Sequence, residues 1–178
     1  PARAMNEVGR LLGAYKDAVG VPERVEWLMA DSQFVVSYGN VELVSRLIDG
    51  SFPDYRQIIP TQFRTTATVS RQEVAKAIRA ASLFSRQGLY DVHMEITAGA
   101  LVLTAADSGT GTHTAELAAE VTGDPNKVLL NYKYVMDGLN TMGTDRVVFH
   151  VIDAMNPVVI KPADGHGAFQ YIVMPIRQ

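Results

Sequence analysis

The chain has 178 residues, a formal net charge of −3 and no cysteine. The missing thiols exclude disulfides and thiolate metal sites, and they fit a cytoplasmic protein. The acidic balance argues against tight, charge-driven binding of nucleic acid. Hydrophobic residues make up 47% of the chain and supply a sizeable core. No apolar run reaches the roughly 18 residues of a membrane span, so we expect no membrane partner.

The first third of the chain predicts one helix followed by three strands. Apolar residues at helical spacing, with charged residues between them, indicate a helix over 3–15. Runs of strand-forming residues between turn residues then predict strands over 24–29, 33–37 and 41–48.

The same order recurs twice. A strand over 63–69 precedes a helix that Ser70 can cap, with Glu73 three residues later and an apolar stripe of Val74, Ala77, Ile78 and Ala81. The strands expected after this helix cover 90–97, 100–105 and 112–121. The third round is predicted as a strand over 127–131, a helix over 133–142 and strands over 146–152, 157–161 and 169–175.

This repetition predicts an α+β fold of duplicated half-domains, each with one helix packed on an antiparallel sheet. Asp49-Gly50 and Pro53 interrupt the pattern, which makes 49–60 the best candidate linker. We therefore expect an incomplete domain over 1–59 and a complete one over 60–178. The chain opens on Pro1 and enters helical sequence almost at once, as expected of a piece of a longer protein.

Signals of catalysis are absent from the sequence. The four histidines lie on separate predicted strands and loops, without the spacing of a helical metal site: His93, His113, His150 and His166. Gly109-Thr110-Gly111 lacks the third glycine of a nucleotide-binding loop and is typical of a hairpin turn. We expect no enzymatic activity, no metal and no cofactor.

Three motifs carry a specific resemblance. They are Leu47-Ile48-Asp49-Gly50-Ser51-Phe52-Pro53-Asp54-Tyr55-Arg56 with Ile58-Ile59-Pro60, the run Asn131-Tyr132-Lys133-Tyr134-Val135-Met136-Asp137, and the ending Tyr171-Ile172-Val173-Met174-Pro175-Ile176-Arg177. Together, and in order along the whole chain, they resemble the bacterial DNA polymerase III beta subunit, the sliding clamp. The resemblance implies the DNA-clamp fold, and it places the first motif between the second and third domains of that family.

The resemblance implies a processivity factor whose full-length homodimer forms a ring around double-stranded DNA, with weak, non-specific contacts. Such a topological link explains how an acidic protein can work on DNA. This chain would hold the second half of the middle domain and all of the C-terminal domain. The basic residues expected to face DNA from the inner helices are Arg3, Arg10, Lys76, Arg79 and Lys133. Leu83 and Phe84 match an apolar pair at the family's ring interface, although they could instead be core residues.

Polymerase III alpha subunit, clamp loader and repair proteins bind this family through linear motifs. The matching pocket positions are Pro53, Ile58, Leu89, Asn131, Tyr134, Met155, Pro157, Ile172, Val173, Met174, Pro175, Ile176 and Arg177. Leu89, Met155, Gln57 and the terminal Gln178 depart from common family residues, which can alter peptide preference. The alternatives are a small hydrolase of similar mixed fold and a peptide-interaction module unrelated to replication.

Overall fold

The computed structural model describes residues 1–15, 23–165 and 169–177. The chain divides into two compact units, Pro1–Pro53 and Asp54–Gln178, so the division falls within the segment 49–60 that the sequence indicates as a linker. Within the described residues, no helix combines the length and the apolar character needed to cross a membrane.

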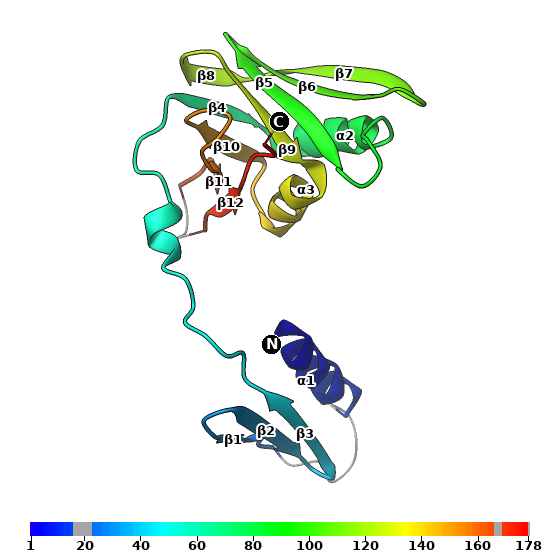
Figure 1. The fold of residues 1–178 in the computed structure, drawn as a ribbon, viewed down its shortest axis with the longest axis vertical. Helices are drawn as coiled ribbons and strands as arrows, with labels where there is room; N and C mark the ends of the chain where they lie inside the picture. The colour runs from blue at the N-terminus through cyan, green and yellow to red at the C-terminus, as the bar shows by residue number, and fades with distance from the viewer. Residues whose placement is uncertain (16–22, 166–168, 178) are drawn as a thin grey trace. The chain divides into compact units, whose positions relative to one another are not determined.

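The first unit is one helix on a three-stranded antiparallel sheet (Figure 1). Its elements are α1 (Ala2–Ala14), β1 (Glu26–Met29), β2 (Gln33–Tyr38) and β3 (Val41–Arg46), with strand order β1-β2-β3. Val8 of α1 packs on Phe34 and Val36 of β2, and these are the fully buried apolar side chains among the described residues of the unit. The helix therefore covers one face of the sheet.

Strand β1 is exposed to solvent through its side chains and along one backbone edge. All four of its residues are exposed, Leu28 and Met29 to 66% and 68%. Trp27 stacks on Phe34 with ring centroids 5.9 Å apart. Only β2 pairs with β1 among the described residues, so one edge of β1 presents unpaired backbone groups.

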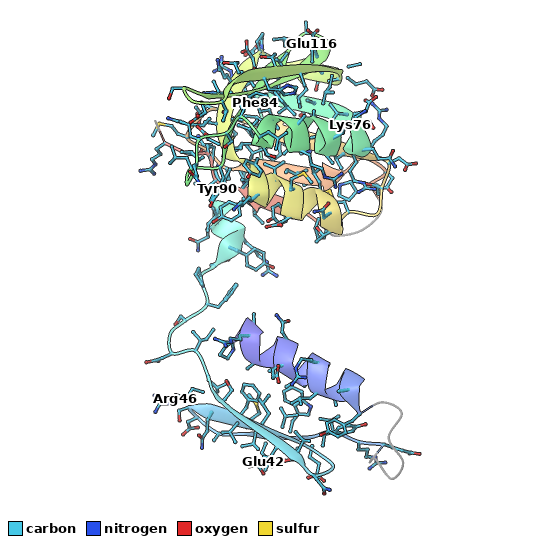
Figure 2. The ribbon with its side chains drawn as sticks, turned by 90° about the vertical axis from the view of Figure 1, so that its right-hand side faces the viewer. Glu42, Arg46, Lys76, Phe84, Tyr90 and Glu116 are labelled. Atoms are coloured by element: carbon cyan, nitrogen blue, oxygen red, sulfur yellow. The ribbon has the colours of Figure 1, made fainter. Side chains whose placement is uncertain are left out.

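The second unit contains two antiparallel sheets and two α-helices (Figure 1). The sheets have the orders β12-β11-β10-β4-β8 and β7-β6-β5-β9, and α2 and α3 lie side by side (Figure 2). The elements are η1 (Tyr55–Ile58), β4 (Thr65–Ser70), α2 (Arg71–Ser82), β5 (Asp91–Thr97), β6 (Ala100–Asp107), β7 (Gly111–Ala118), β8 (Glu120–Gly123), β9 (Asn126–Asn131), α3 (Tyr132–Thr141), β10 (Arg146–Val151), β11 (Val158–Pro162) and β12 (Tyr171–Val173).

The two repeated halves of this unit exchange their first strands. Strand β4 precedes α2 but pairs with β10 of the second half, and β9 precedes α3 but pairs with β5 of the first half. The helix-and-strand repeat that the sequence predicts is therefore present, but each sheet contains strands from both halves.

Helix α2 begins as the sequence predicts. The Ser70 hydroxyl accepts a hydrogen bond from the backbone N–H of Glu73 at 3.4 Å, and this bond satisfies one free donor of the first turn. The predicted stripe of Val74, Ala77, Ile78 and Ala81 is buried, in one core with residues of both sheets and of α3.

One predicted element was wrong. The expected strand over 112–121 is two strands in different sheets, since β7 pairs with β6 and β8 pairs with β4. The chain crosses between the sheets at Ala119, whose N–H donates to the carbonyl of Gly99. Side-chain alternation continues through the crossing, so periodicity alone could not reveal it. The last predicted strand, over 169–175, is likewise reduced to the three residues of β12.

Candidate functional site

The end of β9 and the start of α3 bring three predicted pocket residues together. Asn131 caps α3, because its Oδ1 accepts from the backbone N–H of Lys133 at 3.0 Å. Its Nδ2 donates to the carbonyl of Leu89 at 3.5 Å. Leu89 and Tyr134 are both large apolar side chains with substantial exposure, 45% and 57%. Asn131 thus anchors both segments that carry these two exposed apolar side chains.

Tyr90 fixes the loop that carries Leu89. Its φ of 54° lies in the left-handed region, which a bulky residue seldom adopts. The carbonyl of Tyr90 accepts from Tyr132 N–H at 2.8 Å, and the two rings meet edge to face. The Lys133 ammonium lies 3.3 Å from the centre of the Tyr90 ring. These contacts hold an otherwise unfavourable backbone conformation.

A buried carboxylate holds the same loop from the other side. Asp91 accepts hydrogen bonds from Ser85 Oγ at 3.2 Å, from Arg86 N–H at 3.1 Å and from Arg86 Nε at 2.7 Å, and it pairs with Arg86 Nη2. Burial raises the pKa of Asp91, but the hydrogen bonds and charge of Arg86 outweigh it, and the net pKa is lowered.

The C-terminal tail joins the two sheets of the second unit. Strand β12 pairs with β11, and after Val173 the chain leaves that sheet. Three residues later, Ile176 N–H donates to the carbonyl of Leu129 on β9 at 2.8 Å. Between these anchors, Pro175 is buried and Met174 is 52% exposed. The tail therefore displays Met174 from a backbone fixed at both ends.

Helix α3 is seated against β12 by a glycine. A Cβ on Gly138 would lie 2.6 Å from the ring of Tyr171, so only glycine permits this approach. Tyr171 is thereby held against the helix that carries Tyr134.

A cavity of about 450 Å³ opens beside the tail. It is lined by His93, Lys127, Val128, Leu129, Ala154, Met155, Ile176 and Arg177. Three of these residues, Met155, Ile176 and Arg177, were predicted for the peptide pocket.

The other predicted pocket residues differ in exposure. Pro157 and Val173 are buried, and Ile172 is half-buried. Ile58 is exposed on η1, and Pro53 is exposed at the end of the first unit. Met155 is 67% exposed, on a turn held by hydrogen bonds from the N–H groups of Met155 and Asn156 to Asp153 Oδ1.

The residues expected to face DNA also differ in their surroundings. Lys76 and Arg79 are exposed on α2, where Figure 2 labels Lys76, and neither side chain has an ion-pair partner among the described residues. Arg10 is paired with Glu7 on α1, and Arg3 is exposed there. The Lys133 ammonium lies over Tyr90, as described above.

The predicted interface pair follows α2. Leu83 is 73% exposed. Phe84 is half-buried against the core and stacks on His113 of β7, with centroids 5.6 Å apart. Leu83 alone thus offers a large free apolar surface.

His150 serves local packing. Burial lowers the pKa of His150, which hydrogen-bonds to Thr66 Oγ1 at 3.1 Å and stacks on Phe63. His166 lies outside the described residues. The described part of the chain contains no cluster of three or more histidine or carboxylate side chains suited to a metal ion.

Sequence reasoning missed five lining residues of the cavity: His93, Lys127, Val128, Leu129 and Ala154. Alternation within β5 and β9 could have placed His93, Lys127 and Leu129 on the face opposite to the core. The pairing of β5 with β9, which brings them together, joins strands of different halves and leaves no local signal.

Known proteins show the same fold and sequence pattern. Residues 56–177 match the family model described as DNA polymerase III beta subunit, C-terminal domain. The beta sliding clamps of Synechocystis and Staphylococcus epidermidis are each 28% identical to the chain over 179 residues, which is 99% of this chain and 44% and 46% of those proteins. The chain thus spans less than half the length of the curated relatives it matches.

Solved structures agree. A Pseudomonas aeruginosa sliding clamp, 24% identical, superposes with a TM-score of 0.82 over 100% of this chain and 47% of its own. The Bartonella birtlesii clamp, solved bound to griselimycin, is 29% identical, with a TM-score of 0.82 over 100% and 46% of the two chains. With the family model covering most of its length, this chain belongs to the DNA polymerase III beta-subunit family of sliding clamps.

Proposed function

We propose that this chain is part of a DNA sliding clamp and that its second unit binds linear peptide motifs of replication and repair proteins. The observation that carries the proposal is a set of exposed apolar side chains whose backbones are held by hydrogen bonds. Leu89, Tyr134 and Met174 come from separate elements, and hydrogen bonds to Asn131, Leu89 and Leu129 fix their backbones. Peptide grooves need such preorganised apolar anchors beside a polar group.

The full-length protein would act by topology. We propose that residues 1–59 belong to a middle clamp domain and 60–178 to the C-terminal one, in a homodimeric ring that encircles DNA in the cytoplasm. Lys76 and Arg79, exposed on α2, are the best placed of the basic candidates to meet phosphates, and Leu83 the better placed of the interface pair. The role is non-catalytic: the polymerase, a binding partner, performs the chemistry.

Peptide titration tests this function. A labelled peptide containing Gln-Leu-Ser-Leu-Phe should bind the chain, and Met174→Ala or Tyr134→Ala should weaken binding by about tenfold, the typical effect of removing one buried anchor. Fluorescence anisotropy gives the affinities. Circular dichroism verifies that each variant is folded.

Met29→Ala is the matched control for Met174→Ala. Met29 is similarly exposed but lies on β1 of the first unit, so its removal should leave affinity unchanged. If Met174→Ala and Tyr134→Ala bind as well as the parent chain, the pocket is not at the end of β9.

A further inference from the structure

The cavity beside the tail has a mixed chemical character. Leu129 and Ile176 are the apolar side chains of its lining beside the tail, whereas its charged side chains, Lys127 and Arg177, are both cationic. A ligand that fills it should therefore combine a negative charge with an apolar part.

Strand pairing builds the wall formed by the second sheet. In the register of β5 and β9, His93 lies opposite Leu129 and Glu95 lies opposite Lys127. Directly opposed residues share one face of an antiparallel sheet. The bond from Ile176 N–H to the Leu129 carbonyl then sets the tail along the free edge of β9, next to this face. The cavity is thus preformed by main-chain hydrogen bonds.

The charges in the cavity are only partly neutralised. Glu95 lies 3.6 Å from the Lys127 ammonium in a pair exposed on both sides, so it screens Lys127 weakly. Arg177 has no hydrogen-bond or ion-pair partner among the described residues. Asp153, the acid nearest Met155 in the chain, has its Oδ1 occupied by its own turn. His93 adds a neutral polar ring, because burial, and then Lys127, lower its pKa.

We propose that this cavity binds an acidic residue that flanks the apolar motif of a partner peptide. The inference rests on the proposed function and extends it from the apolar anchors to charge specificity. Continuity supports a peptide: Ile176 and Arg177 line the cavity, and the same tail displays Met174 two residues earlier. A peptide seated on Met174 needs only a few further residues to reach Lys127, since an extended chain advances about 3.3 Å per residue.

Charge-matched peptides test the proposal on the whole chain. One peptide carries Glu-Glu before the Gln-Leu-Ser-Leu-Phe motif, another carries it after, and two more carry Gln-Gln at the same places. At least one acidic peptide should bind about twofold to fivefold more tightly than its Gln-Gln counterpart at low salt, the range of a partly exposed ion pair. Lys127→Gln should bring the ratio of the two affinities, acidic peptide to Gln-Gln peptide, close to one. It should do so without changing the affinity for the Gln-Gln peptides.

Arg146→Gln is the matched control, because Arg146 also forms an exposed surface ion pair, with Glu120, and its loss changes the net charge equally. Arg146→Gln should leave the ratio of the affinities for acidic and Gln-Gln peptides unchanged. A ratio near one in the parent chain, or one that survives Lys127→Gln, overturns the inference even if the motif binds. An acidic peptide without the motif that binds as tightly as the full peptide also overturns it, because the cavity is then an independent site. If no peptide binds, the proposed function fails first and the inference with it.

Discussion

At the scale of single residues, the described contacts around Asp91 decide whether the Leu89 loop keeps its shape. The carboxylate is buried, and its partners Ser85 and Arg86 both belong to the loop that leads to Leu89. A carboxyl with a lowered pKa contributes stability above its unfolded pKa, near 3.8, and loses it as the pH falls through its lower folded value.

Asp91→Asn should therefore destabilise the second unit at pH 7 by about 1–3 kcal/mol, since the hydrogen-bond donors of Ser85 and Arg86 lose a buried, charged acceptor. The difference from the parent chain should shrink in strongly acidic buffer, where the parent carboxyl is also protonated. Urea unfolding at pH 7 and in acid measures it.

The control is Asp124→Asn, which removes an exposed pair with Arg64 and should cost about 0–1 kcal/mol at pH 7. An Asp91→Asn effect that is the same at both pH values would show that packing, rather than charge, is responsible.

Residues with local signals were predictable. The Ser70 cap and the buried stripe of α2 follow from spacing within one helix. Tyr90 and Asp91 were not predicted to matter, because their conformations depend on Tyr132, Lys133 and Arg86. Two of these partners lie on another element, and no pattern in the sequence links them to Tyr90.

At the scale of elements, the contact between α3 and β12 depends on Gly138. Gly138→Ala should destabilise the second unit by about 1–3 kcal/mol, because overpacking against Tyr171 outweighs the roughly 1 kcal/mol that alanine adds to a helix interior. Peptide affinity should fall as well, since β12 leads directly into the tail. Thermal unfolding and anisotropy measure the two effects.

A second change shows whether the clash is the cause. Tyr171→Val makes room for the new methyl group, so the double variant should be more stable than the sum of the two single changes predicts. Additive effects would mean that Gly138 matters for another reason than its approach to Tyr171.

The α-helices and most strands could be predicted, with boundaries one or two residues away, whereas the short helix η1 fell in the expected linker. Pairing could not. The crossing at Ala119 and the contact of the tail with Leu129 both depend on which strands become neighbours. That choice is made by packing of the whole core, and the local alternation is compatible with several partners.

At the scale of the whole molecule, the described residues of the first unit leave large apolar side chains exposed. Among its described residues, three buried apolar side chains and the partly buried ones around them form its core, while Leu28 and Met29 are exposed on strand β1. Exposed apolar edges recruit other strands, so the chain should self-associate as its concentration rises.

Leu28→Glu should reduce this association, because it places a charge on the open strand. Sedimentation velocity over a concentration series measures the change. Asn40→Asp adds the same charge in the turn between β2 and β3 and should have little effect. Equal effects of the two variants would point to net charge rather than to the edge of β1.

The division into two units and the repetition of helix and strands could be anticipated from the breaks at 49–60 and from the recurring pattern. The exchange of β4 and β9 could not, since a repeat unit read from sequence carries no mark of which sheet its first strand joins.

That exchange also constrains how the chain is made. Thr66 and its partner His150 are 84 residues apart, so β4 leaves the ribosome long before β10 exists. Until then, β4 and β5 of the nascent first half each have one unpaired edge, because the strands that pair there, β10 and β9, have not yet been synthesised. Pairing over such distances is slow, and open edges invite misassembly. The interval before β9 and β10 have been synthesised is therefore the one in which this domain most needs chaperone protection.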